Sequence, residues 1–199
     1  MSAKLHIGSG TIYLQGYVNV DVPSPRCFLS SERPDLVEAY ATSEAHYYAR
    51  HDDHKAIQSF RGGPEAALYV CDRYGSWFAL PCRDGDAEEL LSRGVFEHLS
   101  ETEAHAALRE ARRVLAPEGL LRLSVPDHEA TLDLFIKTRD PLYVRFLLGP
   151  RGEGAGYHMK SYTRTALRAL VESHGFVFER NELNPHVYPM HCVAWKKPI

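Results

Sequence analysis

Short apolar stretches that suit strands alternate with longer amphipathic stretches that suit helices along most of the chain. The strand candidates are four to six residues long and lie at 4–7, 17–22, 67–71, 88–92, 120–125, 176–179 and 191–196. Alternation of this kind predicts an α/β fold with a doubly wound, mostly parallel sheet of about seven strands. The last two candidates have no helix between them, so we expect them to pair as an antiparallel edge.

The clearest helix signal covers residues 101–115. Ser100 is a candidate N-cap, Glu103 completes a capping box three residues later, and Pro117 and Gly119 follow the last turn. Further helices are expected at 129–138, 141–148 and 164–174.

Two segments depart from a regular alternation of strands and helices. Only residues 11–16 separate the first two strands, which is too few for a full crossover helix. Residues 23–67 form a long polar stretch whose middle, from Asp35 to Phe60, we expect to be helical. We therefore predict one domain, 1–199, with a helical insertion at 23–67 that caps a cleft.

The amino-acid composition limits the kinds of protein that this chain can be. The 199 residues are 44% hydrophobic and 25% charged, with a formal net charge of −3. These values indicate a globular protein rather than a disordered one. There is no basic stripe and no long apolar run, so we expect neither nucleic-acid binding nor membrane insertion, and the N-terminus lacks a signal-peptide pattern. A cytoplasmic protein is the expectation.

The four cysteines, Cys27, Cys71, Cys82 and Cys192, contain no Cys-x-x-Cys pair. This pattern predicts reduced thiols. Because the eleven histidines are scattered, we expect no dedicated metal site.

Candidate ligand-binding residues follow three successive strands. The turn Gly8-Ser9-Gly10 ends the first strand, Asp21 ends the second, and Asp72 ends the third. In doubly wound folds such positions line a crevice at the carboxyl edge of the sheet and bind nucleotide-like ligands. Each signal is weak alone, because aspartate at a strand end is commonly a turn former.

The chain resembles class I S-adenosylmethionine-dependent methyltransferases, a Rossmann-like family, and is most similar to a small bacterial branch (methyltransferase type 11-like). The resemblance rests on five blocks: Lys4–Gly10, Gly16–Asp21, Gly94–Leu99, Leu108–Asp127 and Ser173–Phe176. One departure is Glu118, which stands where that family usually has glycine.

The resemblance implies roles for cofactor-binding residues. Gly8, Ser9 and Gly10 would pass close to S-adenosylmethionine or S-adenosylhomocysteine, and Asp21 would bind the ribose hydroxyls. Asp72 would lie near the adenine, and Arg93 and Gly94 would border the methionyl end. The short 11–16 connection leaves the partner of the cofactor's carboxylate open.

Acceptor-side candidates lie in later loops. Asp127 and His128 follow the fifth strand, where His128 could act as a general base; the alternative for Asp127 is helix capping. His158 and Tyr162 follow a glycine-rich loop containing Arg151, and Tyr47 and Tyr48 belong to the insertion. Catalysis is therefore assigned to His128, His158 and Asp127, and substrate binding to Tyr47, Tyr48, Tyr162 and Arg151. Glu97-His98 is interpreted as a pair that orients a loop and a helix start beneath the cofactor; an acid/base pair is the alternative.

These observations predict methyl transfer to the hydroxyl, carboxylate or amine of a small-molecule acceptor by a monomer or homodimer. A cofactor-binding partner subunit of the same fold that does not methylate is the alternative. A nicotinamide- or nucleotide-sugar-binding enzyme fits less well, because no third glycine follows Gly10.

Overall fold

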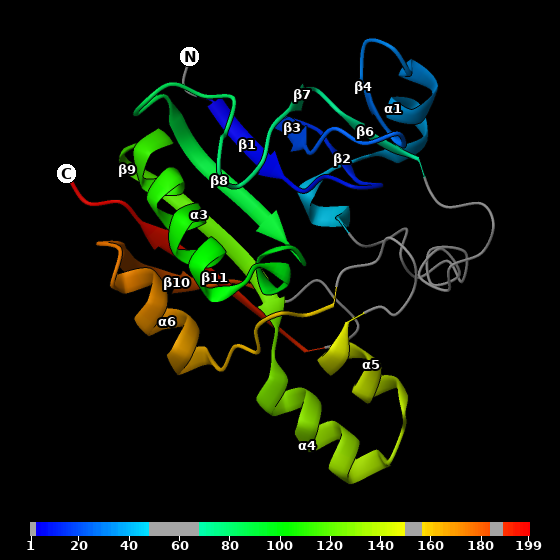
Figure 1. The fold of residues 1–199 in the computed structure, drawn as a ribbon, viewed down its shortest axis with the longest axis vertical. Helices are drawn as coiled ribbons and strands as arrows, with labels where there is room; N and C mark the ends of the chain where they lie inside the picture. The colour runs from blue at the N-terminus through cyan, green and yellow to red at the C-terminus, as the bar shows by residue number, and fades with distance from the viewer. Residues whose placement is uncertain (1–2, 48–67, 150–156, 184–188) are drawn as a thin grey trace.

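A computed structural model describes residues 3–47, 68–149, 157–183 and 189–199. Seven strands of these residues form one sheet in the order β10-β11-β9-β8-β1-β3-β7 (Figure 1). The strands are β1 (Ala3–Ile7), β3 (Val18–Asp21), β7 (Arg73–Tyr74), β8 (Ala87–Arg93), β9 (Leu115–Pro126), β10 (Val177–Asn181) and β11 (Met190–Lys196). Neighbours from β7 to β9 are parallel, whereas β11 is antiparallel to both β9 and β10. The expected mostly parallel α/β sheet with an antiparallel C-terminal pair is confirmed.

Four of the predicted helices are confirmed. They are α3 (Glu101–Val114), α4 (His128–Thr138), α5 (Leu142–Leu148) and α6 (Arg164–Glu172). Ser100 caps α3 through the complete capping box with Glu103, and Thr163 caps α6. Figure 1 shows α3 and α6 side by side on one face of the sheet, with α4 and α5 beyond the end of β9.

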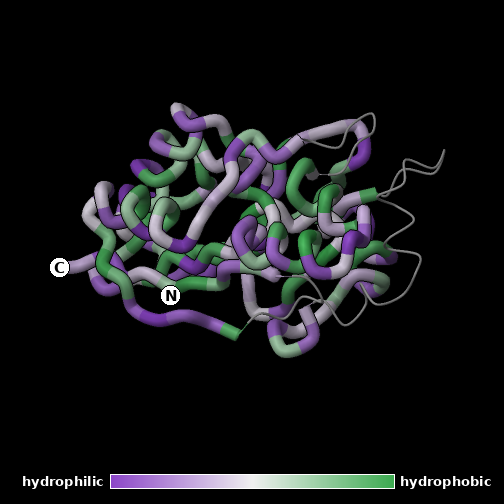
Figure 2. The backbone as a smooth tube through the Cα atoms, turned by 90° about the horizontal axis from the view of Figure 1, so that it is seen from below, coloured by the Kyte–Doolittle hydropathy of each residue, from purple (hydrophilic) through white to green (hydrophobic). Residues whose placement is uncertain are grey.

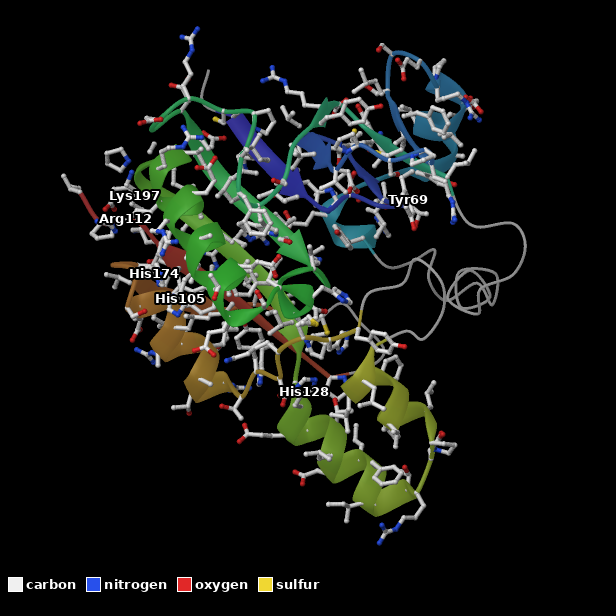
Figure 3. The ribbon with its side chains drawn as sticks, in the orientation of Figure 1. Tyr69, His105, Arg112, His128, His174 and Lys197 are labelled. Atoms are coloured by element: carbon white, nitrogen blue, oxygen red, sulfur yellow. The ribbon has the colours of Figure 1, made fainter. Side chains whose placement is uncertain are left out.

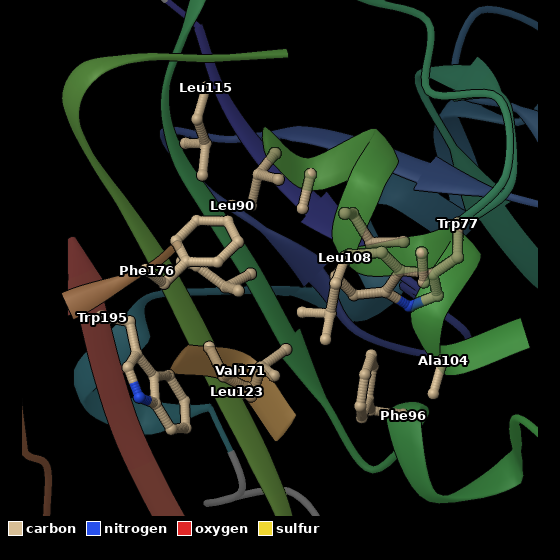
Figure 4. Close-up of a cluster of buried hydrophobic side chains, with 14 of the residues drawn as sticks. Trp77, Leu90, Phe96, Ala104, Leu108, Leu115, Leu123, Val171, Phe176 and Trp195 are labelled. Carbon is tan, nitrogen blue, oxygen red and sulfur yellow. The ribbon is translucent and has the colours of Figure 1, made fainter. Parts of the chain in front are cut away.

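The main core lies between the sheet and the helices α3 and α6. Leu90 and Leu123 of the sheet pack with Leu108 of α3 and Val171 of α6, and Trp195 closes the side toward β11 (Figure 4). In the hydropathy view, hydrophobic stretches run through the middle of the molecule (Figure 2). The amphipathic patterns of the sequence therefore account for this half of the fold.

The opposite face of the sheet carries a polar network. Glu89 and Arg122 alternate along their strands with core leucines, so they point away from α3. The Arg122 guanidinium donates to the carboxylates of Glu89 (2.6 Å), Glu182 (2.9 Å) and Glu44. These buried charges are paired, as charges in a low-dielectric setting must be.

A small sheet replaces the missing crossover helix. Strand β2 (Tyr13–Leu14) occupies the short connection and pairs in parallel with β5 (Ala41–Thr42) of the insertion. Asn19 holds β2 in place: its Oδ1 accepts from the Leu14 N–H at 2.8 Å, and its Nδ2 donates to the Leu14 carbonyl at 3.1 Å. Side-chain hydrogen bonds thus satisfy backbone groups that a helix would have satisfied internally.

The predicted helix from Asp35 to Phe60 is wrong in its described part. Helix α1 covers only Pro34–Tyr40, then β5 and the 3₁₀ turn η1 (Glu44–His46) follow. The helix stops because Ala41 adopts an extended conformation and pairs with β2. Residues 48–67 lie outside the described residues, so the cap over a cleft stays a prediction.

The predicted third strand is also corrected. Strand β6 (Tyr69–Cys71) pairs with β4 (Cys27–Leu29) in a separate two-stranded sheet. In the main sheet it is β7, and not the predicted strand, that pairs with β3 and forms the edge. The insertion supplies a nearer backbone partner for β6, which periodicity in the sequence cannot reveal.

All four cysteines are free thiols, as predicted. None of the helices in the described residues is long and apolar enough to span a membrane.

Candidate active site

The carboxyl ends of β1 and β8 meet the first glycine turn. Gly8 has φ +74°, and a Cβ there would lie 2.4 Å from Cγ2 of Val95. The Ser92 hydroxyl donates to the Ile7 carbonyl at 3.1 Å and links the two strand ends. Glycine at position 8 therefore lets the segment after β8 pack directly on the turn.

Asp21 reaches back from the end of β3 to the same turn. Its Oδ2 accepts from the Gly10 N–H at 2.7 Å and from the Ser9 hydroxyl at 3.4 Å. Gly10 has φ +54°, and no atom lies within 4 Å of where its Cβ would stand. Oδ1 of Asp21 accepts from the Val22 N–H at 2.8 Å, so about one acceptor site of the carboxylate stays open beside the free space at the turn.

Asp72 lies close to the turn but is already engaged. Its carboxylate accepts from the Tyr13 hydroxyl at 2.6 Å, the Ser30 hydroxyl at 2.8 Å, and the backbone and side-chain N–H groups of Asn19. These four bonds use about the full capacity of a carboxylate. The adenine contact implied for Asp72 stays a prediction and requires one of these donors to be displaced.

Arg93 ends β8 with a buried guanidinium. Its Nη2 pairs with Glu44 at 3.2 Å, and the group lies over the Tyr47 ring at 4.5 Å. Nε and Nη1 have no hydrogen-bond partner. Buried donors of this kind are costly unless an anion or water satisfies them.

A second group of ionisable residues lies at the turn after β8. Glu97, in the 3₁₀ turn η2 (Phe96–His98), is buried, and its Oε2 has no partner. Burial raises the pKa of this carboxyl to about 8. His158 Nε2 lies 4.0 Å from Oε1 of Glu97. Burial and the neighbouring rings of His98 and His128 lower the pKa of His158 to about 4.

Backbone bonds hold His158 beside Glu97. The N–H groups of Met159 and Lys160 both donate to the Glu97 carbonyl, at 2.9 and 3.1 Å. The rings of His98 and His158 meet edge to face with centroids 5.0 Å apart. Tyr162 is buried beside Phe96, and its hydroxyl has no partner. The structure therefore places both predicted residues against η2: His158 beside Glu97 and Tyr162 beside Phe96.

His128 begins α4 at the end of β9 (Figure 3). Its ring is buried, its centroid is 6.1 Å from that of His158, and neither nitrogen has a partner. Burial lowers the pKa of His128. Asp127 caps α4 by accepting from the Ala130 N–H at 2.9 Å, and its other oxygen lies 3.2 Å from Nδ1 of His191.

Other predicted residues fall elsewhere. Tyr47 is buried on the polar face of the sheet, where its hydroxyl bonds to Nε2 of His6. The structure therefore places it beside Arg93 and not beside the catalytic candidates His128 and His158. Gly94 donates its N–H to the Ser124 carbonyl at 2.9 Å. Tyr48 and Arg151 lie outside the described residues.

Sequence reasoning left Glu97, His98 and His191 out of the site. The adjacent Glu97-His98 pair is visible in the sequence, where it is interpreted as a pair that orients a loop and a helix start. Nothing in the sequence pointed to His191, which β11 brings to Asp127 by antiparallel pairing with β9.

Comparisons with known proteins place these features in context. Residues 37–123 match the model of a family described as a methyltransferase domain. No curated protein matches the chain.

Solved structures share the fold over almost the whole chain. A SAM-dependent methyltransferase from Methanosarcina mazei matches with a TM-score of 0.56 and 15% identity over 100% of this chain and 93% of that one. An S-adenosylmethionine-dependent methyltransferase from Mesorhizobium loti has a TM-score of 0.51 and 11% identity, covering 98% and 90%. The 1,6-didemethyltoxoflavin-N1-methyltransferase of Burkholderia thailandensis, with bound 1,6-didemethyltoxoflavin and S-adenosylhomocysteine, has a TM-score of 0.53 and 13% identity, covering 100% and 72%. At these identities the likeness is one of fold.

Proposed function

We propose that the chain is a class I S-adenosylmethionine-dependent methyltransferase that methylates a hydroxyl group of a small-molecule acceptor. The match of residues 37–123 to a methyltransferase-domain model and the fold shared with solved SAM-dependent methyltransferases support this family. The observation that carries the proposal is His128: a buried imidazole at the carboxyl end of β9 with no partner on either nitrogen. A carboxylate acceptor needs no base, and a neutral amine already offers the lone pair that attacks. A base-competent ring therefore favours a hydroxyl, whose O–H must lose its proton.

The residues of the turn fit the cofactor. Open space lies beside Gly10, Asp21 retains acceptor capacity for ribose hydroxyls, and Arg93 has two unpartnered donors. We assign Asp21 to the ribose and Arg93 to the cofactor's carboxylate, which the short 11–16 connection leaves without a partner. When bound, S-adenosylmethionine supplies an activated methyl group and leaves as S-adenosylhomocysteine.

The chain's own contribution is orientation and proton transfer. Bringing the acceptor oxygen into line with the methyl group supplies most of the acceleration, because methyl transfer needs little further chemistry. The acceptor O–H gives its proton to His128 while its oxygen forms the new bond to carbon. Nε2 of His158 lies 4.0 Å from Oε1 of Glu97, whereas neither nitrogen of His128 has a partner, so His158 is the weaker base candidate. Asp127 positions α4 and His128 through its cap.

The acceptor is proposed to be small. The formal net charge of −3 gives no support to a polyanionic substrate, and the candidate catalytic groups are buried side chains rather than an exposed surface.

Labelled methyl transfer tests the proposal. Matched sets of small aromatic and aliphatic molecules, differing only in carrying a hydroxyl, a carboxylate or an amine, are incubated with methyl-labelled cofactor. We expect label in the hydroxyl series. His128→Ala should lower kcat by at least about 100-fold, the usual worth of a general base, with S-adenosylhomocysteine affinity unchanged in calorimetry.

The matched control is His174→Ala, which removes a histidine on the α3–α6 surface (Figure 3). It should leave kcat unchanged. Exclusive labelling of carboxylates, or full turnover by His128→Ala, would contradict the hydroxyl assignment.

A further inference from the structure

Three side chains beside the proposed acceptor position form a set of metal ligands. Glu97, His98 and His158 each offer one ligand atom, and these three atoms all lie within 4.8 Å of one another. We propose that they bind a divalent transition-metal cation, with Zn²⁺ the ion that fits best. This proposal deepens the proposed function and rests on it for the identity of the neighbouring acceptor.

The first support is the isolation of the Glu97 carboxyl. Its side chain is only 3% exposed, and among the described residues it has no lysine or arginine partner within 4 Å. Its Oε2 accepts no hydrogen bond. Burying an ionised carboxylate without a cation is unfavourable, so such a group stays protonated when it is alone. A bound cation would favour the ionised carboxylate and would give Oε2 a partner.

The second support is the orientation of the histidines. The Tyr157 carbonyl can only accept, so His98 Nδ1 is the donor in their 3.1 Å bond. This bond fixes the tautomer and leaves the ring's lone pair on Nε2. Metal-binding histidines characteristically donate their other nitrogen to a carbonyl or carboxylate in this way.

Backbone contacts also tie the two ligand-bearing segments together. Met159 and Lys160 donate to the carbonyl of Glu97 itself. His158 Nε2 consequently stays 4.0 Å from Oε1 of Glu97, a separation that ligands on one cation approach with small side-chain adjustments.

The donor set points to the class of metal. Two imidazoles and one carboxylate form the ligand set of catalytic zinc sites and of other open divalent sites, in which protein leaves at least one position to water or substrate. The His128 ring stands 6.1 Å from that of His158. The proposed base is therefore close to the ligand set, and an oxygen acceptor that can ligate a metal is the expected substrate class.

The sequence does not reveal this grouping, because its ligands do not follow a local spacing motif. Glu97 and His98 are adjacent, but His158 comes from a segment sixty residues later. A second grouping, Asp127, Glu129 and His191, is the weaker candidate, because Asp127 already caps α4 and Glu129 is exposed.

Direct binding of the metal tests the proposal without reference to activity. The full-length protein is stripped with a chelator and titrated with Zn²⁺ by calorimetry and with Co²⁺ by visible absorption. We expect one equivalent per chain and Co²⁺ bands of a four- or five-coordinate site. Glu97→Gln and His158→Asn should each weaken binding at least tenfold. His105→Ala is the matched control, because His105 Nδ1 lies 3.2 Å from Nε2 of His174 and could bind metal adventitiously.

The outcomes separate this proposal from the function it rests on. Each sample is also tested for S-adenosylhomocysteine binding and for its melting temperature. Absence of metal binding in a protein that still binds S-adenosylhomocysteine would overturn the metal site and leave the methyltransferase intact. Loss of metal binding in His105→Ala, with binding retained in both Glu97→Gln and His158→Asn, would overturn it as well.

Discussion

Arg93 shows how one buried side chain can discriminate between parts of a ligand. Glu44 and the Tyr47 ring hold the guanidinium, yet two of its nitrogens have no partner. A charged hydrogen bond contributes about 1.5–3 kcal/mol, so a carboxylate placed there would be bound selectively.

Arg93→Met should therefore reduce affinity for S-adenosylhomocysteine by about 10–100-fold, because it removes a charged partner worth about 1.5–3 kcal/mol. It should scarcely change affinity for 5′-methylthioadenosine, which lacks the amino-acid carboxylate. Calorimetry with both ligands measures the ratio. An equal loss for both would mean that Arg93 only shapes the site.

His6 is a buried histidine on the polar face of the sheet, bonded to Asn19 (2.9 Å) and to Tyr47. Burial lowers its pKa from 6.5 to about 4, opposed by the bond to Asn19. The unfolded chain therefore binds one more proton than the folded chain between these values, and the free energy of unfolding falls as pH drops from about 6.5 to 4.

The contribution of His6 to this loss is about 3 kcal/mol. Urea unfolding of wild type and His6→Gln across this range measures it. The variant should be less stable at pH 7 but should lose less stability on acidification. Parallel pH curves for the two proteins would show that His6 does not titrate as stated.

The positions of site residues were predictable where a short sequence motif places them at the end of a strand. The glycine turn and Asp21 lie together as expected, because both end adjacent parallel strands. The engagement of Asp72 by Tyr13 and Ser30 was not predictable, since those contacts depend on a connection and an insertion without regular periodicity.

At the scale of elements, the turn that begins β9 contains an unfavourable residue. Glu118 has φ +66°, a conformation that costs a side-chain-bearing residue roughly 1 kcal/mol. Its carboxylate gains only an exposed contact with Lys196 at 3.2 Å. The departure from glycine seen in the sequence is thus a local cost.

Glu118→Gly should raise the free energy of unfolding by about 0.5–1 kcal/mol, since glycine adopts this conformation freely. Chemical denaturation measures the change. Glu118→Ala is the control: it removes the carboxylate but keeps the strain, and it should not stabilise. Stabilisation by alanine equal to that by glycine would assign the effect to charge instead.

Elements were predictable where capping and periodicity agreed, as in α3 and α6. They were also predictable where an apolar run forms a central strand, as in β8 between β1 and β9. They were not predictable in the insertion. The apolar residues Leu36 and Tyr40 suit a longer helix, but pairing between β5 and β2 outweighs helix propensity after Tyr40. Local pattern cannot anticipate a pairing partner 28 residues away.

At the scale of the whole molecule, ligand binding should stabilise the fold as one unit. S-adenosylhomocysteine at about 100 times its Kd adds roughly 2.7 kcal/mol to the free energy of unfolding. For a chain of this length that raises Tm by about 5–10 °C. Thermal scans with S-adenosylhomocysteine and with NAD check this. No shift with millimolar S-adenosylhomocysteine, or a larger shift with NAD, would contradict the cofactor assignment.

The place of the main core also determines how fast backbone amide protons exchange in different strands. Strands β9 and β11 are hydrogen-bonded on both sides and packed against α3 and α6, whereas β7 is a two-residue edge strand with both residues exposed. Amide protons of β9 and β11 should therefore exchange with deuterium only when the whole molecule unfolds, and those of β7 by local opening. Because β7 follows Asp72 directly, the segment that carries Asp72 should open many times for each opening of β9, the strand that ends just before His128.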